Sequence, residues 1–236
     1  MKGSIIPMLT VAVVTILILG GCLLAPPSAP PAPPSAPPTL LPEAEPAPTP
    51  TPPALPPEAE PSLFEGGGFS FLYPSNWQTM TEADIDKLWE TELRGQIGEF
   101  SRQDVIWEGG VFWGQVDPSN YPDSANIFTL IVTVSGIPGQ MSEADYDDAF
   151  NRVKAAFESG LGERLYSIQK RMVRDLQAIE VVSLGLSRNQ IVRGIFIFAK
   201  PDHLYYFGCG VSNNAQEFFE PIFDETIASL EVRLIE

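Results

Sequence analysis

The sequence has few of the residues from which active sites and metal centres are usually built. It contains one histidine and two cysteines in 236 residues, which excludes a zinc site with several histidine ligands. It has no Gly-x-Ser-x-Gly nucleophile elbow and no glycine-rich phosphate loop followed by Lys-Ser or Lys-Thr. The only histidine, His203, is expected in a surface turn beside Asp202. We therefore predict a protein that is not an enzyme and that carries no cofactor and no metal.

Basic residues are also scarce, with 14 Lys and Arg against 30 Asp and Glu. Lys2 is the only charged residue before Cys22, and four acids lie in residues 22–61, so residues 62–236 hold 13 basic and 26 acidic residues. A net charge of −13, the difference of those two counts, repels phosphate backbones and anionic headgroups. Nucleic-acid binding is therefore not expected, and the folded part should stand away from a lipid surface.

The first residues have the pattern of an export signal. Lys2 precedes an apolar stretch from Ile5 to Leu19, which is followed by small residues. Leu19-Gly20-Gly21-Cys22 resembles the lipobox of bacterial lipoproteins. The resemblance implies cleavage of residues 1–21, a diacylglycerol on the Cys22 thiol and often a further acyl chain, such as palmitate, on the new amine. An uncleaved helical anchor stays open as the alternative, because Ile5 to Ala25 is just long enough to span a bilayer.

Both alternatives attach the chain to a cell membrane and place its folded part on the extracytoplasmic side, because Lys2 holds its own end inside. Seventeen of the 24 prolines fall between Cys22 and Pro61. Prolines at this density favour an extended polyproline II conformation, at about 3.1 Å per residue, and prevent a packed core. Residues 22–61 are therefore predicted to be a disordered proline-rich tether that acts as a spacer. Binding to proline-reading domains is an alternative role.

Residues 62–236 predict one α+β domain, a central antiparallel β-sheet flanked by helices (an α-β-α sandwich). Gly66-Gly67-Gly68 is expected to be a flexible connection from the tether to the first strand. The last four strands follow one another through short turns, which predicts an antiparallel meander. The predicted strands are 69–73, 111–116, 127–134, 166–173, 177–186, 190–199 and 204–211, and the predicted helices begin at Thr81, Ser142 and Asn213.

The opening of this domain, residues 68–77, reads GFSFLYPSNW and resembles the first strand of PsbP-like domains. The helix that carries Phe219 to Ser229 is similar to that family's closing helix, so the resemblance covers about Ser62 to Leu230. It implies an α-β-α sandwich. The best-known members are extrinsic subunits of photosystem II, and bacterial members are often lipoproteins; they bind proteins rather than catalyse reactions. Only the opening strand motif carries over, and photosynthetic function is not implied.

Aromatic residues near Gly109-Gly110 are the strongest candidates for a binding surface. Trp107, Phe112 and Trp113 flank the two glycines, and Tyr121 lies in the loop that follows. Such residues can line a groove for a partner or an apolar ligand. The alternative is that they pack alternately into the core. Cys209, between two glycines in a predicted strand, is expected to be a small buried residue with little reactivity.

The loop 117–126 is rich in oxygen ligands, supplied by Asp117, Asn120, Asp123 and Asn126. Hard cations such as calcium prefer such ligands. These residues are spaced three apart throughout, and the glycine and the glutamate of an EF-hand are missing, which argues against an EF-hand site. Asx and proline residues also form ordinary turns.

These observations lead to a first hypothesis: a lipid-anchored, non-enzymatic interaction protein that presents a PsbP-like domain to an envelope protein partner. The second hypothesis is a lipoprotein that binds a small apolar ligand or lipid through the region Trp107–Trp113. The third is a cryptic hydrolase, which would need serine, aspartate or glutamate residues gathered around His203.

Overall fold

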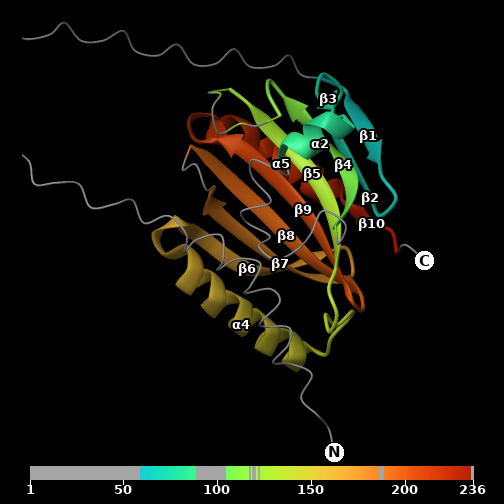
Figure 1. Cartoon of the computed structure of the whole chain (residues 1–236), viewed down its shortest axis with the longest axis vertical. Coiled ribbons are helices and arrows are strands. Elements are labelled where there is room, and N and C mark those ends of the chain that lie inside the picture. Colours follow the sequence, from blue (N-terminus) through green and yellow to red (C-terminus); the bar gives the residue numbers. More distant parts are fainter. Residues whose placement is uncertain are drawn as a thin grey trace, which may run out of the picture.

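The structure is a computed structural model that describes residues 59–88, 105–116, 118, 121, 123–185 and 189–234. The predicted lipobox, the predicted cleavage point before Cys22 and the predicted tether up to residue 58 lie outside the described residues. The described part contains two antiparallel sheets and helices on both faces of the larger one (Figure 1). Its strands are β1 (Pro61–Glu65), β2 (Phe69–Pro74), β3 (Gln78–Thr79), β4 (Val105–Trp113), β5 (Ala125–Thr133), β6 (Leu165–Val173), β7 (Leu176–Leu184), β8 (Gln190–Lys200), β9 (His203–Ser212) and β10 (Glu231–Val232), and its helices are α2 (Glu82–Leu88), α4 (Glu143–Leu161) and α5 (Gln216–Ser229), with 3₁₀ turns at Gly162–Arg164 and Asn213–Ala215.

The larger sheet has seven strands in the order β3-β4-β5-β9-β8-β7-β6, and all neighbouring pairs are antiparallel. Strands β6 to β9 form the predicted meander, in which each strand pairs with the next. The smaller sheet has the order β1-β2-β10. Because β1 and β10 both pair with β2, the first and last strands of the domain lie on the same small sheet.

One face of the large sheet, here called the α4 face, packs against α4 and α2. Helix α4 begins as predicted: the Ser142 hydroxyl accepts a hydrogen bond from the backbone N–H of Asp145 at 3.2 Å. Its buried side chains Tyr146, Val153 and Phe157 follow a helical spacing and enter the core. The Tyr146 hydroxyl also hydrogen-bonds to the carbonyl of Ala178 on β7. The helix is thereby fixed to the sheet at the β6–β7 side.

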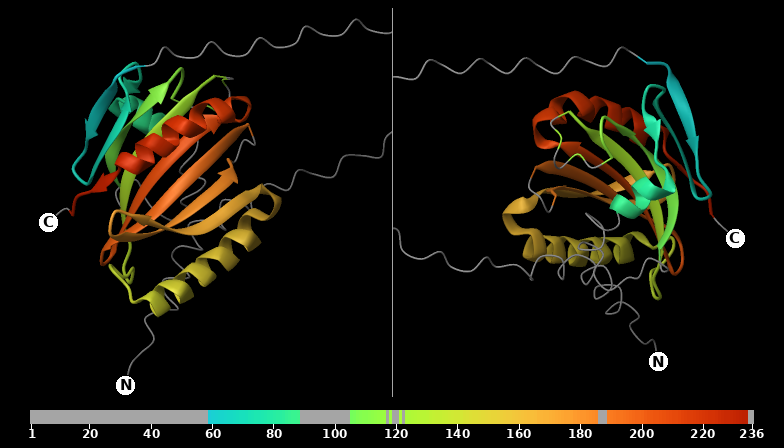
Figure 2. Two further views of the ribbon diagram at one scale, coloured as in Figure 1. Left: turned by 180° about the vertical axis from the view of Figure 1, so that it is seen from behind. Right: turned by 45° about the horizontal axis from the view of Figure 1, so that its top comes forward.

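The opposite face, here called the α5 face, packs against α5 and the small sheet. Figure 2 shows α5 crossing this face. Its buried residues Phe219, Phe223 and Ile227 join a core that includes Phe71 and Phe207. The rings of Phe71 and Phe207 meet edge to face at 5.4 Å, which joins the two sheets.

The α+β class with a central antiparallel sheet and flanking helices is confirmed. Strands β1, β3 and β10 were not predicted, because each is short and lacks a clear alternation. Gly66 to Gly68 form the turn of the β1–β2 hairpin, so the prediction that they connect the tether to the first strand was wrong. No helix in the described ranges is long and apolar enough to span a membrane.

Strand β4 begins six residues before its predicted start at Val111. Gly109-Gly110 lies inside this strand, next to a β-bulge: the β4–β5 register shifts between Trp107 and Gly109, and Gly109 has a φ of 121°. Only glycine adopts that conformation readily. The bulge lets the strand continue through the pair.

Candidate functional site

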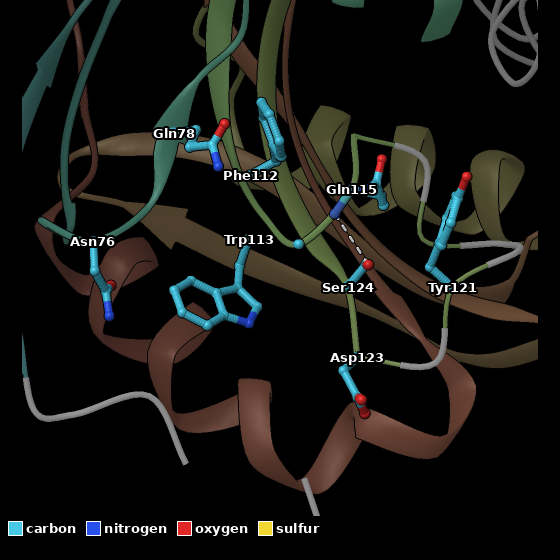
Figure 3. Close-up of a pocket in the computed structure, with 9 residues that line it drawn as sticks. Asn76, Gln78, Phe112, Trp113, Gln115, Tyr121, Asp123 and Ser124 are labelled. Atoms are coloured by element: carbon cyan, nitrogen blue, oxygen red, sulfur yellow. Dashed lines mark hydrogen bonds between the residues drawn. The ribbon is translucent and has the colours of Figure 1, made fainter. Parts of the chain in front are cut away.

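A pocket of about 450 Å³ lies at the end of β4, beside the short strand β3. We call it the Trp113 pocket, and it is lined by Asn76, Gln78, Phe112, Trp113, Gly114, Gln115, Tyr121, Asp123 and Ser124. Figure 3 shows the side chains of Asn76 and Trp113 extending to the same side of the ribbon. The pocket combines aromatic rings with amide and hydroxyl groups, which is the usual make-up of a binding site.

Local backbone geometry holds this pocket open at one end. Gly114, directly after β4, has a φ of 75°, and a Cβ there would lie 2.7 Å from the Ser124 hydroxyl. The same hydroxyl accepts the backbone N–H of Gln115 at 3.1 Å (Figure 3). Asn126, buried on β5, donates from Nδ2 to the carbonyl of Val116 at 2.7 Å. These bonds fix the start and end of the loop that carries Tyr121.

The amide of Asn76 is the most unusual polar group of the pocket. Its Nδ2 and Oδ1 are both enclosed, and neither has a hydrogen-bond partner among the described residues. An enclosed polar group without a partner costs about 1–3 kcal/mol relative to a satisfied one. The described residues therefore leave the hydrogen-bonding capacity of Asn76 unused at the wall of the pocket.

The structure brings three of the four predicted aromatic residues to this pocket and leaves one away from it. Phe112, Trp113 and Tyr121 line it, and Tyr121 is 43% exposed. Trp107 lies on the α4 face, where its ring stacks on Phe128 with 5.6 Å between centroids and 7° between planes. Trp107 thus serves the core, whereas Trp113 and Tyr121 border a space open to solvent. Phe112 lines the same space but is itself buried in the core of the α4 face.

A second candidate, which sequence analysis missed, is a network of charged side chains on the α5 face. Glu180 on β7 is 1% exposed, and its Oε2 accepts from Arg171 Nη1 at 2.5 Å and from Gln169 Nε2 at 3.1 Å. Its Oε1 accepts from Arg193 Nε, and Arg193 Nη1 donates to Asp224 on α5 at 2.6 Å. We call these five residues the Glu180 network. It links β6, β7, β8 and α5.

The electrostatics of the Glu180 network favour the charged forms. Burial alone would raise the pKa of Glu180, but the hydrogen bonds and positive charges of Arg171 and Arg193 outweigh it and lower that pKa. Burial would lower the pKa of Arg193, yet Asp224 and Glu180 raise it. A cavity of about 190 Å³ lies beside the network, lined by Ser167, Gln169, Glu180, Arg193, Cys209 and Glu220. Both carboxylate oxygens of Glu180 accept hydrogen bonds from protein donors.

The network had a weak signal in the sequence. Glu180 and Arg193 each interrupt an apolar strand, and they carry opposite charges on consecutive strands of a predicted hairpin. In the observed register Arg193 is opposite Val182, so it lies diagonally across from Glu180 on the same face. The two charges could be recognised as a pair from the sequence only if the register of the hairpin were already known.

The other residues that the sequence analysis singled out, His203 and Cys209, have no features of a functional site among the described residues. His203 opens β9 after the Pro201–Asp202 turn, and its Nδ1 lies 2.8 Å from the carbonyl of Pro201. The described residues around it give the hydrolase hypothesis no support. Cys209 is fully buried, as predicted, and burial raises the pKa of its thiol. The described residues contain no group of three or more His, Cys, Asp or Glu that could hold a metal ion.

In the proposed calcium loop, Asp117 and Asn120 lie outside the described residues. Asp123 is exposed and lines the Trp113 pocket, and Asn126 belongs to β5. The structure therefore separates Asn126 from the loop, because its side chain is buried and bonded to Val116.

No family model matches the chain, and no curated protein matches its sequence. Among solved structures, it is similar to cyanobacterial PsbP from Synechocystis, with 13% identity over 74% of this chain and 94% of that one and a TM-score of 0.43. A protein of unknown function from Pseudomonas aeruginosa has 12% identity, covers 75% and 100% of the two chains and has a TM-score of 0.39. LpqN, involved in cell envelope biogenesis of Mycobacterium tuberculosis, has 9% identity, 74% and 91% coverage and a TM-score of 0.38. The solved structures similar to this chain thus include a PsbP protein, the family that the opening motif resembles.

Proposed function

We propose that this chain is a lipid-anchored extracytoplasmic protein that presents its α+β domain to a protein partner of the cell envelope, without catalysis. The observation that carries the proposal is the order of three segments in the sequence. A lipobox ends at Cys22, a stretch with 17 prolines follows, and the first strand begins at Pro61. A lipid, a spacer and a folded domain in this order hold a protein surface at a distance from a membrane.

The geometry of the domain supports a binding role for the Trp113 pocket. Exposed aromatic side chains dominate the energy of protein interfaces, because they bury much area at low entropic cost. Tyr121 and the half-buried Trp113 offer such area, and the Asn76 amide has polar atoms with no partner in the described part of the chain. The Glu180 network, in contrast, is occupied with its own internal bonds.

The anchor is tested by replacing Cys22, with Cys209 as the matched control. In a bacterial host fed an alkyne fatty acid, the wild-type chain and the Cys209→Ala variant should take up the label and stay with membranes. The Cys22→Ala variant should lose the label. A label retained on this variant would refute lipidation at Cys22, and a wild-type chain that stays with membranes without any label would instead support the uncleaved helical anchor.

The partner is tested with a photo-crosslinking amino acid placed at Tyr121, with Tyr166 as the control. Both side chains are exposed tyrosines, at 43% and 54%, but Tyr166 lies on β6, away from the pocket. Irradiation of intact cells should link one envelope protein to position 121 and not to position 166. The proposal fails if neither position, or both alike, captures protein.

A second function, binding of a small apolar ligand or lipid, is favoured by the size of the same pocket. Ligand pockets usually enclose about 300–1,000 Å³, and this one is about 450 Å³. Native mass spectrometry of the full chain from envelope extracts should then show a retained small molecule that Trp113→Ala removes. Spectra with only the mass of the protein would count against this function.

A further inference from the structure

The chain enters the domain at the rim of the Trp113 pocket. The backbone N–H of Ser75 donates to the carbonyl of Glu60 at 3.0 Å, and Pro61 pairs with Pro74 across the β1–β2 hairpin. Asn76, the residue directly after Ser75, lines the pocket. The last residues of the tether are therefore joined covalently to a point beside this pocket.

The chemistry of the pocket fits a polyproline II segment. Such a segment has no internal hydrogen bonds, so its carbonyls need donors from outside. Aromatic-lined grooves with a few amide or hydroxyl donors bind proline-rich segments in this way. Trp113 and Tyr121 supply rings, and the Asn76 side chain in the pocket wall carries an amide that has no partner among the described residues.

The tether carries a fitting segment close to the rim. Residues 52–57 read PPALPP, and residues 46–57 contain no charged residue. Three residues per turn place Pro53 and Pro56 on one edge of a polyproline II helix. At about 3.1 Å per residue, Pro57 lies within roughly 9 Å of Glu60 along the chain. An uncharged segment also avoids repulsion by a domain with a net charge of −13, from 13 basic and 26 acidic residues.

We infer that the Pro52–Pro57 segment of the tether docks into the Trp113 pocket of its own chain in the polyproline II conformation. A short linker gives such a docking an effective concentration in the millimolar range, so that weak contacts suffice. This inference uses the pocket of the proposed function: an envelope partner that binds there has to displace the segment. The rest of the tether remains free to act as a spacer.

The first test uses the full chain carrying Cys22→Ala, purified and irradiated with the crosslinker at Tyr121 or, as a control, at Tyr166. Mass spectrometry should map intramolecular links from position 121 to residues 46–58, and links from position 166 should show no such preference. The same pattern from both positions would overturn the inference. Links that appear only at high protein concentration would also overturn it, because they would show the tether of a second copy.

A matched pair of tether variants sharpens the test. Alanine at Pro52, Pro53, Pro56 and Pro57 should reduce the links from position 121 about fivefold or more, because the bound conformation is lost. Alanine at the distal Pro26, Pro27, Pro30 and Pro31 should leave them unchanged. Equal yields from the two variants would refute docking of this segment.

The two proposals fail in distinguishable ways. In cells, the proximal proline variant should increase capture of the envelope partner at position 121, because the pocket is no longer occupied. Partner capture that is unchanged by the proximal variant refutes the docking and leaves the proposed function standing. The absence of any captured partner, together with intramolecular links that the proximal variant removes, refutes the partner and leaves the docking standing.

Discussion

The Glu180 network and the Trp113 pocket lie on the same sheet, yet they differ in how far their polar groups are hydrogen-bonded. In the network, one carboxylate receives bonds from two arginines and a glutamine, and three neighbouring strands are joined. In the pocket, an enclosed amide has no partner among the described residues, and a tyrosine is exposed. Saturated buried charges contribute to a fixed structure, whereas unsatisfied groups beside aromatic rings remain free to bind. We therefore expect mutations in the first region to change stability and mutations in the second to change binding.

The largest expected effect is on stability, from Glu180→Ala. Removing the carboxylate leaves Arg193 and Arg171 without their common partner in a largely buried place, which typically costs about 3–5 kcal/mol. Urea unfolding of the full Cys22→Ala chain should show this loss. As a control, Asp148→Ala breaks the exposed pair with Arg152 and should cost less than about 1 kcal/mol. Equal losses in the two variants would mean that the network is no more important than a surface pair.

Acid should weaken the wild-type protein through the same carboxylate. The pKa of Glu180 is lowered in the folded state from its ordinary value of 4.5. Its contribution to stability is therefore complete above that value and is lost as the pH falls through the lower folded-state pKa. Urea midpoints measured at about pH 7, 4 and 3 should fall less steeply for Glu180→Gln than for the wild type. If the urea midpoints of the two proteins fell in parallel with pH, Glu180 would make no contribution to acid unfolding.

A smaller effect is expected at the outer end of the network. Asp224 bonds Arg193 but its side chain is 60% exposed, so water can replace much of the interaction. We expect Asp224→Asn to cost less than about 1 kcal/mol in urea unfolding. A loss as large as that of Glu180→Ala would place the critical contact between α5 and β8 rather than among the strands.

The smallest effect on stability is expected in the pocket. Tyr121→Ala should change the free energy of unfolding by no more than about 0.5 kcal/mol, because the side chain is exposed. Partner capture by a crosslinker at Gln115, on the same pocket, should nevertheless fall about tenfold. Tyr166→Ala should leave both quantities unchanged. If Tyr121→Ala destabilises the fold and spares capture, the contrast between the two regions is wrong.

The sequence predicted most helices and strands, because their patterns reflect local rules. Ser142 caps α4 through a bond three residues away, and the largely apolar runs of β7 to β9 follow from burial on both faces of one sheet. The short strands β1 and β10 depend on pairing with β2 from opposite ends of the domain. No local pattern can reveal such a pairing.

The aromatic residues of the candidate site also depend on strand pairing that the sequence does not reveal. Trp107 and Trp113 are six positions apart, so in a regular strand they would share a face. The bulge between Trp107 and Gly109 adds one residue and reverses the alternation. The two rings therefore lie on opposite faces, one in the core with Phe128 and one at the pocket. A single extra residue decides which aromatic residue is available for binding.

The β1–β2 hairpin also determines how the domain responds to tension. With Cys22 anchored as proposed, a pull on the tether acts at Pro61, and Pro61 is paired with Pro74 at the open end of the hairpin. Force applied there loads the hydrogen bonds of the hairpin one after another, starting with the bond between Ser75 and Glu60, instead of all together. The peeling of β1 would separate Phe64 from Phe71, whose rings stack at 4.6 Å, before the seven-stranded sheet carries load. In that arrangement the small sheet is the first part of the domain to bear the load.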